Sequence, residues 1–189
     1  MAKRALKAVA VTTPIKLDLG CGKECREGFI GVDRHKFPGV KVIADLTKKW
    51  PWDNDSVAEI HMSHILEHFT GVERVHIFNE MDRVLQKGGT ALIVTPSWAS
   101  ARAYGDFDHK WPPVSEQLYA YLSREWRLDK APDTDISNNP QGYTCNLNAT
   151  VGWSGFHPEL AGKSDAARMW WLTFGKEAAF DLMATITKP

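Results

Sequence analysis

The sequence predicts an α/β protein built on an open, mostly parallel β-sheet of the doubly wound, Rossmann-like type. Two observations lead to this prediction: short apolar runs alternate with loops and an amphipathic helix, and most of these runs stop at Gly, Asp or Ser. The length of 189 residues allows one well-buried core and leaves little chain for a second domain. We therefore expect a single domain over residues 1–189.

The predicted strands are short apolar runs bounded by turn residues. The run IKLDL stops at Gly20-Cys21-Gly22, which is typical of a strand followed by a tight turn. Apolar residues at steps of three and four over residues 71–86 predict a helix, which Gly88-Gly89 stops. Strands are predicted over residues 15–19, 29–32, 40–46, 57–62, 91–94, 144–153 and 179–187.

The last third of the chain is less regular. Apolar residues at helical spacing predict helices over residues 115–127 and 165–176. Residues 133–146 are rich in Pro, Asn and Asp, which predicts a long loop.

Polar clusters stand at the ends of four consecutive predicted strands: Gly20-Cys21-Gly22, Asp33, Asp45 and Ser63-His64. In an open parallel sheet, ligands bind beyond the carboxyl ends of the strands. The coincidence of the four clusters therefore predicts a ligand site at this edge, more strongly than any single motif does.

The turn LDLGCGK favours a cationic ligand without phosphates. It lacks the G-x-x-x-x-G-K-[ST] pattern of a nucleotide P-loop, and it lacks the third glycine and the acid about 20 residues on that a dinucleotide site uses. Asp18 brings negative charge just before the glycine pair, and Asp33 could accept both hydroxyls of a ribose. S-adenosylmethionine, a sulfonium and an ammonium on an adenosine, meets these requirements.

The chain resembles the class I S-adenosylmethionine-dependent methyltransferases in an ordered series of segments: LDLGCGK, FIGVD, ADLTKKWPWDNDSVAEIHMSHILEHF and NEMDRVLQKGGTALIVTPSW. The similarity covers residues 15–98 and is greatest to small single-domain, methyltransferase type 11-like members with an "SHxLEH" signature. It implies a seven-stranded sheet with an antiparallel C-terminal strand, with S-adenosyl-L-methionine as cofactor and S-adenosyl-L-homocysteine as product. It also implies a cofactor-binding core over residues 15–98, a variable acceptor or lid region over 99–160, and a closing helix and strand over 165–187.

The resemblance further implies a role for each strand-end residue. The methionine moiety of the cofactor would lie on the first turn, the ribose at the second strand end and the adenine at the third, while the fourth strand end would border the methyl-transfer pocket. The cofactor-binding residues implied in this order are Asp18, Leu19, Gly20, Cys21 and Gly22, then Asp33 and Arg34, then Asp45 and Leu46, then Ser63 and His64.

Two segments depart from the family pattern. Gln86-Lys87-Gly88-Gly89 stands where the family has Lys-Pro-Gly-Gly, in a structural turn. GDFDH at residues 105–109 is a looser match to G-D-P-T-H, because Phe107 and Asp108 replace Pro and Thr before His109.

A general base would assist methyl transfer to a hydroxyl or an amine, and histidine suits that role near neutral pH. His64 and His109 are the two candidates, because both are expected to face the methyl side of the cofactor. The alternative, in which each makes only structural hydrogen bonds, stays open.

The segment HILEH fits the H-x-x-E-H pattern of one class of zinc peptidases. A zinc site of that kind needs one continuous helix from His64 to His68 and a further protein ligand. The preceding residues AEIHM are strand-like, which places His64 at a strand end. We therefore expect no metal here, and structural roles for Glu67 and His68.

The methyl acceptor is not identified by any motif. The place of the [DNS]-P-P-[YFW] motif of adenine-N6, cytosine-N4 and glutamine methyltransferases reads Met62-Ser63-His64-Ile65, and the Pro-Cys pair of cytosine-C5 enzymes does not occur. Aromatic residues gather between positions 98 and 126, either as a lid over an apolar or planar acceptor or as core under a long loop: Trp98, Tyr104, Phe107, Trp111, Tyr119, Tyr121 and Trp126. We expect a small-molecule acceptor; the alternatives are a nucleic-acid methyltransferase and a catalytically silent cofactor-binding protein.

The charge balance argues against a broad attraction to nucleic acid or to anionic membranes, because Lys plus Arg and Asp plus Glu number 23 each. The N-terminal apolar run is too short for a signal peptide, and no run is long enough to span a bilayer. Three cysteines without framework spacing indicate reduced thiols and a cytoplasmic location.

Overall fold

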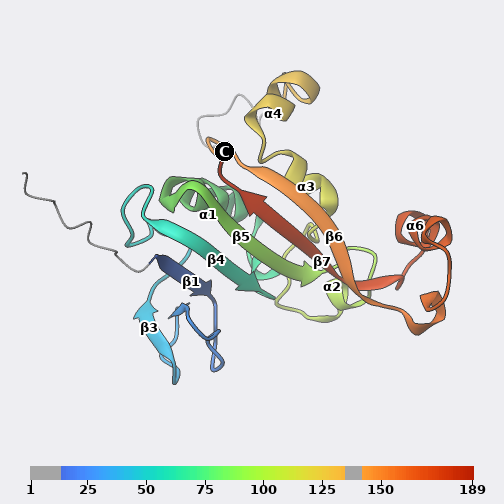
Figure 1. Cartoon of the computed structure of the whole chain (residues 1–189), viewed down its shortest axis with the longest axis horizontal. Helices are drawn as coiled ribbons and strands as arrows, with labels where there is room; N and C mark the ends of the chain where they lie inside the picture. Colours follow the sequence, from blue (N-terminus) through green and yellow to red (C-terminus); the bar gives the residue numbers. More distant parts are fainter. Residues whose placement is uncertain (1–13, 135–141) are drawn as a thin grey trace, which may run out of the picture.

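The computed structural model describes residues 14–134 and 142–189. They form one seven-stranded sheet with the order β3-β2-β1-β4-β5-β7-β6 (Figure 1). Neighbouring strands are parallel except for β7, which runs antiparallel to both β5 and β6. The predicted fold is therefore confirmed, including the antiparallel C-terminal strand.

The strands lie close to their predicted positions. Their bounds are β1 Ile15–Leu19, β2 Ile30–Asp33, β3 Val40–Ile43, β4 Val57–Ser63, β5 Leu85–Pro96, β6 Asn148–Phe156 and β7 Ala179–Thr187. The largest difference is at β5, which begins six residues before the predicted strand over 91–94. The chain begins pairing there as soon as the preceding helix ends, because Leu85 already lies beside Val57 of β4.

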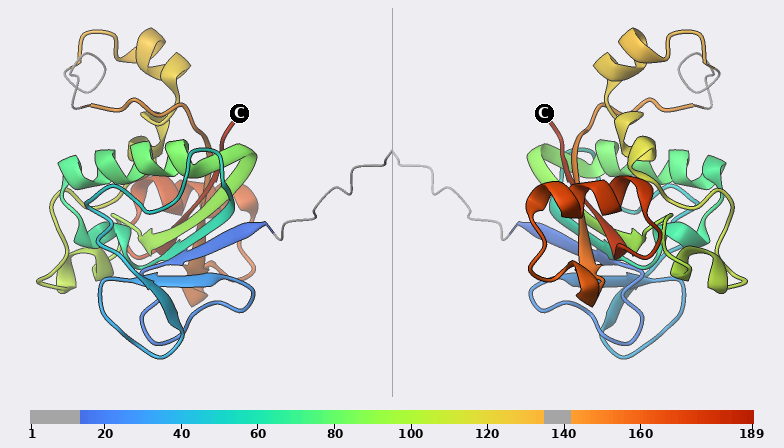
Figure 2. Two further views of the ribbon diagram at one scale, coloured as in Figure 1. Left: turned by 90° about the vertical axis from the view of Figure 1, so that its left-hand side faces the viewer. Right: turned by 90° about the vertical axis from the view of Figure 1, so that its right-hand side faces the viewer.

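One helix, α1 (Gly71–Val84), covers the parallel half of the sheet (Figure 2). Thr70 and Glu73 form a reciprocal capping box at its start, which satisfies two backbone amides that would otherwise lack partners. Its buried face presents Ile77, Phe78 and Met81 to the core. Residues 15–57 contain no α-helix, so the connections between β1, β2, β3 and β4 are loops and turns.

The helices of the last third are shorter than predicted. The expected helix over residues 115–127 is two helices, α3 (Glu116–Ala120) and α4 (Arg124–Lys130), because Ser123 leaves the helical conformation and caps α4 through its hydroxyl. The remaining helices are α2 Arg102–Gly105, α6 Asp165–Phe174, and the 3-10 turns η1 Leu66–His68 and η2 Pro158–Leu160. The expected loop over 133–146 falls partly outside the described residues.

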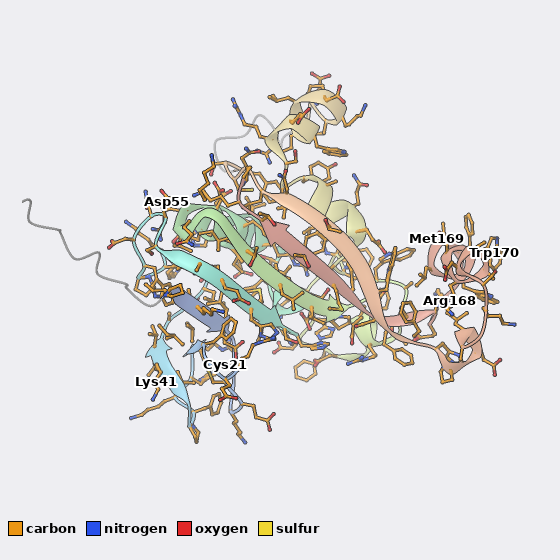
Figure 3. All side chains as sticks on the ribbon, in the orientation of Figure 1. Cys21, Lys41, Asp55, Arg168, Met169 and Trp170 are labelled. Carbon is orange, nitrogen blue, oxygen red and sulfur yellow. The ribbon has the colours of Figure 1, made fainter. Side chains whose placement is uncertain are left out.

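The core lies between the sheet and α1 and continues under α3. A second, smaller cluster of buried residues lies under α6, at the end of the molecule opposite β3 (Figure 1). The outer side of α6 is exposed and apolar at Met169 and Trp170 (Figure 3). Within the described ranges, no helix has the length and apolar character needed to cross a membrane.

Candidate functional site

The carboxyl ends of β1, β2, β3, β4 and β5 meet along one edge of the sheet. The Gly20 amide donates to the Val32 carbonyl at 2.7 Å, and the Ala44 amide donates to the Asp33 carbonyl at 3.0 Å. The His64 amide donates to the Val94 carbonyl at 2.8 Å. These bonds hold the ends of neighbouring strands together at the edge where the sequence predicts a ligand site.

A cavity of about 500 Å³ opens at this edge. We call it the strand-end cavity; its wall includes Gly20, Asp33, Arg34, Asp45, Leu46, Ile65 and His68. Its volume lies within the usual range for small-molecule sites. Five predicted cofactor residues therefore line one cavity, while the other six lie outside its wall: Asp18, Leu19, Cys21, Gly22, Ser63 and His64.

The turn after β1 requires glycine at two positions. Gly20 has φ +68° and Gly22 has φ +56°, the left-handed region that other residues rarely adopt. A Cβ on Gly20 would also lie 2.3 Å from the side chain of Ile65, whereas one on Gly22 would meet open space. Ile65 therefore closes directly over the backbone of Gly20, and only glycine fits beneath it.

Asp33 accepts a hydrogen bond at each carboxylate oxygen. Oδ2 accepts from the Gly22 amide at 3.0 Å, and Oδ1 accepts from the His35 amide at 2.8 Å. A carboxylate oxygen has two acceptor positions, so each one keeps a position for a ligand hydroxyl. At the next strand end, the hydroxyl and amide of Thr47 hold the pKa of Asp45 below its usual range.

Asp18 is buried and its oxygens have protein partners. Oδ2 accepts from the Arg26 amide at 2.7 Å, and Oδ1 lies 2.8 Å from Nδ1 of His61. Asp18 thus ties the turn after β1 to β4 from beneath. Cys21 lies nearby on the same turn, where burial, followed by nearby Cys25 and Asp18, raises the pKa of its thiol to about 11.

A second pocket, of about 640 Å³, adjoins the strand-end cavity and shares His68 with it. We call it the histidine pocket; its wall includes His64, Glu67, His68, Pro96, Arg102, Phe107 and His109. The structure therefore brings together His64 and His109, the two residues that the sequence singled out as bases.

His64 follows the last residue of β4 in a left-handed conformation, with φ +55°. Its Nδ1 lies 3.5 Å from Oε1 of Glu67 and its Nε2 lies 4.0 Å from Oδ1 of Asp181. The Glu67 carboxylate raises the pKa of His64. His64 and His68 do not share one α-helix, so the arrangement of a zinc-peptidase helix is not formed.

Arg74 joins the two segments that build the histidine pocket, although only 1% of its surface is exposed. Its guanidinium donates to the carbonyls of Leu66 and Glu67 on one side, and to those of Lys110 and Pro112 on the other. The Lys110 amide adds a bond to the Glu67 carbonyl at 2.9 Å. Arg74 is not among the residues predicted from the sequence; the signal that could have found it is a charged residue on the apolar stripe of α1.

The aromatic segment divides between surface and core. Tyr119 is 2% exposed and packs edge-on against Phe78 of α1. Phe107 is 97% exposed at the wall of the histidine pocket. Tyr119 therefore follows the core alternative, whereas the lid alternative stays a prediction for Phe107.

Two groups of possible metal ligands occur in the described parts of the chain. One consists of Asp18, Cys21 and Cys25, and the other of Glu67, His68 and His109; within each group the ligand atoms lie within 4.8 Å of one another. In the first group the Asp18 oxygens are already bonded, and burial raises the pKa of both thiols, which disfavours the thiolates that bind metals.

The fold is shared with solved methyltransferases, whereas comparison of the sequence with models of protein families and with curated proteins finds no match. A SAM-dependent methyltransferase from Archaeoglobus fulgidus superposes with a TM-score of 0.62 at 16% identity, over 93% of this chain and 86% of that one. A putative sarcosine dimethylglycine methyltransferase from Galdieria sulphuraria gives 0.57 at 16% identity, over 93% and 77%. A geranyl diphosphate C-methyltransferase from Streptomyces coelicolor A3(2), crystallised with Mg²⁺, geranyl diphosphate and S-adenosyl-L-homocysteine, gives 0.50 at 14%, over 93% and 74%. The chain thus has the fold of class I S-adenosylmethionine-dependent methyltransferases.

Proposed function

We propose that the protein is an S-adenosylmethionine-dependent methyltransferase that acts on a small-molecule acceptor. The observation that carries this proposal is the convergence of Gly20, Asp33 and Asp45 on the wall of one cavity in a sheet of methyltransferase topology. Carboxylates at the strand ends, in place of a phosphate-binding loop, suit a ligand that is cationic and carries a ribose.

The free acceptor positions of Asp33 fit the two ribose hydroxyls, and Asp45 with Leu46 would border the adenine. Gly20, Cys21 and Gly22 would accommodate the methionine end, with Asp18 and Leu19 beneath them. Arg34 completes the wall beside the ribose, and Ser63 and His64 would border the reacting methyl group.

The bound cofactor would supply an electrophilic methyl group on its sulfonium, and the protein's task is to position an acceptor in line with it. His64 is the better-placed base, because Glu67 orients its ring and favours the protonated form that results from taking the acceptor's proton. His109 lies on the same wall and is the second candidate. Phe107 and Pro96 give this wall an apolar part that suits a small organic acceptor.

Cys21, Cys25 and Cys145 are all free thiols. We propose a cytoplasmic location on the strength of the reduced cysteines.

The test is a screen with S-adenosylmethionine labelled on the methyl group, against pools of small molecules, nucleic acids and proteins. The proposal predicts label in a small-molecule product, lost in His64→Ala. Label in nucleic acid would favour the first alternative, and binding of S-adenosylhomocysteine without any labelled product would favour a catalytically silent protein. Absence of both binding and label would overturn the proposal.

A further inference from the structure

The carboxylate of Glu67 is buried with one oxygen unsatisfied. The residue is 4% exposed, and its Oε2 has no hydrogen-bond partner among residues 14–134 and 142–189. Its other oxygen, Oε1, lies 3.5 Å from Nδ1 of His64. A buried carboxylate oxygen without a partner is costly, so such an atom in a folded protein calls for an explanation.

Two imidazoles lie against this carboxylate. The ring centroids of His68 and His109 are 4.9 Å apart and the rings meet edge-on. A carboxylate oxygen of Glu67 and a ring nitrogen from each histidine all lie within 4.8 Å of one another. One carboxylate and two imidazoles therefore converge on the same small volume at the wall of the histidine pocket.

His109 offers its Nε2 as a ligand, because the nearest carboxylate oxygen, Oδ2 of Asp106, lies 3.9 Å from it and beyond hydrogen-bond distance. Its Nδ1 lies 3.2 Å from the Ala103 carbonyl, which can only accept, so Nδ1 carries the proton and Nε2 keeps a lone pair. A backbone carbonyl that holds the far nitrogen of a histidine is the usual support of a metal-binding imidazole.

The two segments that supply these side chains are held firmly together. Arg74 bonds the carbonyls of Leu66 and Glu67 to those of Lys110 and Pro112, on either side of the cluster. The side chains thus belong to a fixed frame, which is what a preformed site requires.

We propose that Glu67, His68 and His109 bind a divalent transition metal, with Zn²⁺ the best match. Two histidines and one carboxylate, with a further position open, are a donor set of zinc enzymes. At metal–ligand distances of about 2.0–2.1 Å the donor atoms of a tetrahedral site lie ~3.4 Å apart, so the cluster, whose ligand atoms lie within 4.8 Å of one another, would close by at most about 1.4 Å.

The ligand set differs from the one that HILEH suggests by its sequence. In that pattern His64 and His68 would be the helical pair and Glu67 a base, whereas here His109 replaces His64 and Glu67 is itself a ligand. A metal-bound His109 would not serve as a free base, which leaves that role to His64.

If the proposed methyltransferase function holds, the open coordination position of the metal would face the acceptor pocket, where Arg102 also lies, and could bind an oxygen or nitrogen of the acceptor. The metal-binding claim itself stands apart from that function.

The test uses the full chain, stripped of metal with a chelator and titrated with Zn²⁺ alone by calorimetry. We expect one ion per chain, with affinity lowered on the order of 100-fold or more in His68→Asn, His109→Asn and Glu67→Gln. Circular dichroism and thermal melting establish that each variant is folded. Co²⁺ added to the stripped protein should give a visible spectrum typical of nitrogen and oxygen ligands, without thiolate charge-transfer bands.

Two control variants separate this site from others. His157→Asn removes a histidine that does not line the histidine pocket, and the double variant Cys21→Ser, Cys25→Ser removes two members of the other group of possible ligands. Both should bind Zn²⁺ as the unmodified protein does. The proposal is overturned if the unmodified protein binds no Zn²⁺, if folded His68→Asn and His109→Asn variants bind it equally well, or if binding is lost with the cysteines. Binding of S-adenosylhomocysteine, measured separately without metal, reports on the proposed function alone.

Discussion

The strand-end cavity and the histidine pocket are neighbours that share His68, yet they are built in different ways. The cavity is formed by backbone turns and carboxylates that follow directly from consecutive strands, at Gly20, Asp33 and Asp45. The histidine pocket is formed by side chains from two segments about 40 positions apart, which Arg74 holds together. The first depends on local chain geometry and the second on a few long-range hydrogen bonds, so substitutions should affect them differently.

The largest expected effect is on stability in the variant Arg74→Met, which keeps the apolar part of the side chain and removes its donors. Four carbonyls lose the guanidinium as a partner, and we expect a loss of about 3–4 kcal/mol in the free energy of unfolding. Urea denaturation measures it. Arg124→Met on the exposed surface of α4 is the control and should change the value by less than about 0.5 kcal/mol.

Arg74→Met should also change ligand binding at the two sites to different extents. Under conditions where the variant is still folded, Zn²⁺ binding at the histidine pocket should weaken more than S-adenosylhomocysteine binding at the strand-end cavity. Equal losses at both sites would show that the two are not built independently.

A smaller effect is expected from a matched pair of glycine substitutions in the turn after β1. Gly20→Ala places a methyl group against Ile65 at a left-handed position, and we expect a loss of about 2–4 kcal/mol in unfolding free energy. Gly22→Ala places a methyl group at a left-handed position but in open space, so we expect a loss of only about 1 kcal/mol in unfolding free energy.

The contribution of Ile65 can be isolated with the double variant Gly20→Ala, Ile65→Ala. Because the shorter side chain removes the clash, adding Gly20→Ala to Ile65→Ala should cost much less than it costs in the unmodified protein. Equal costs in both backgrounds would show that Ile65 does not close over the turn.

The smallest change to the fold itself is a chemical one, the alkylation of Cys21 on the same turn. With its pKa raised to about 11, the thiol is almost entirely protonated at pH 8, and alkylation by iodoacetamide should be on the order of 100-fold slower than for an unstructured cysteine. The rate should rise about tenfold per pH unit between pH 8 and 10, because that range lies below the raised pKa. Peptide mapping by mass spectrometry follows it, and a plateau near pH 9 would contradict the assigned environment.

The same contrast explains what the sequence could predict. Strand ends can be located from apolar runs and turn residues, so Asp33 and Asp45 were assigned to one edge, and both lie on the cavity wall. The contact between His68 and His109 depends on the path of residues 99–112, which carries no periodic pattern. Arg74 donates to the backbone carbonyls of Lys110 and Pro112, which lie more than 30 positions further along the chain. Every residue has a backbone carbonyl, so these acceptors cannot be recognised from the sequence.

The predicted helix boundaries in the last third of the chain were wrong for a related reason. Apolar residues recur at helical spacing throughout residues 115–127, which predicts one helix. The Ser123 hydroxyl instead accepts from the Trp126 amide and starts a new helix, so the stretch forms α3 and α4. Asp18 was assigned to the methionine end of the cofactor from its position beside the glycine turn, and its bond to His61 of β4 arises only from strand pairing.

The measurement that tests the central claim most directly is a calorimetric titration of the purified protein with S-adenosylhomocysteine. We predict binding of one molecule per chain, weakened about 30-fold or more in Asp33→Ala, because two hydrogen bonds to a charged acceptor are lost. Asp129→Ala, at an exposed carboxylate on α4, should bind as the unmodified protein does. No heat of binding at millimolar S-adenosylhomocysteine, or equal affinity in Asp33→Ala, would contradict the assignment of the strand-end cavity as the cofactor site.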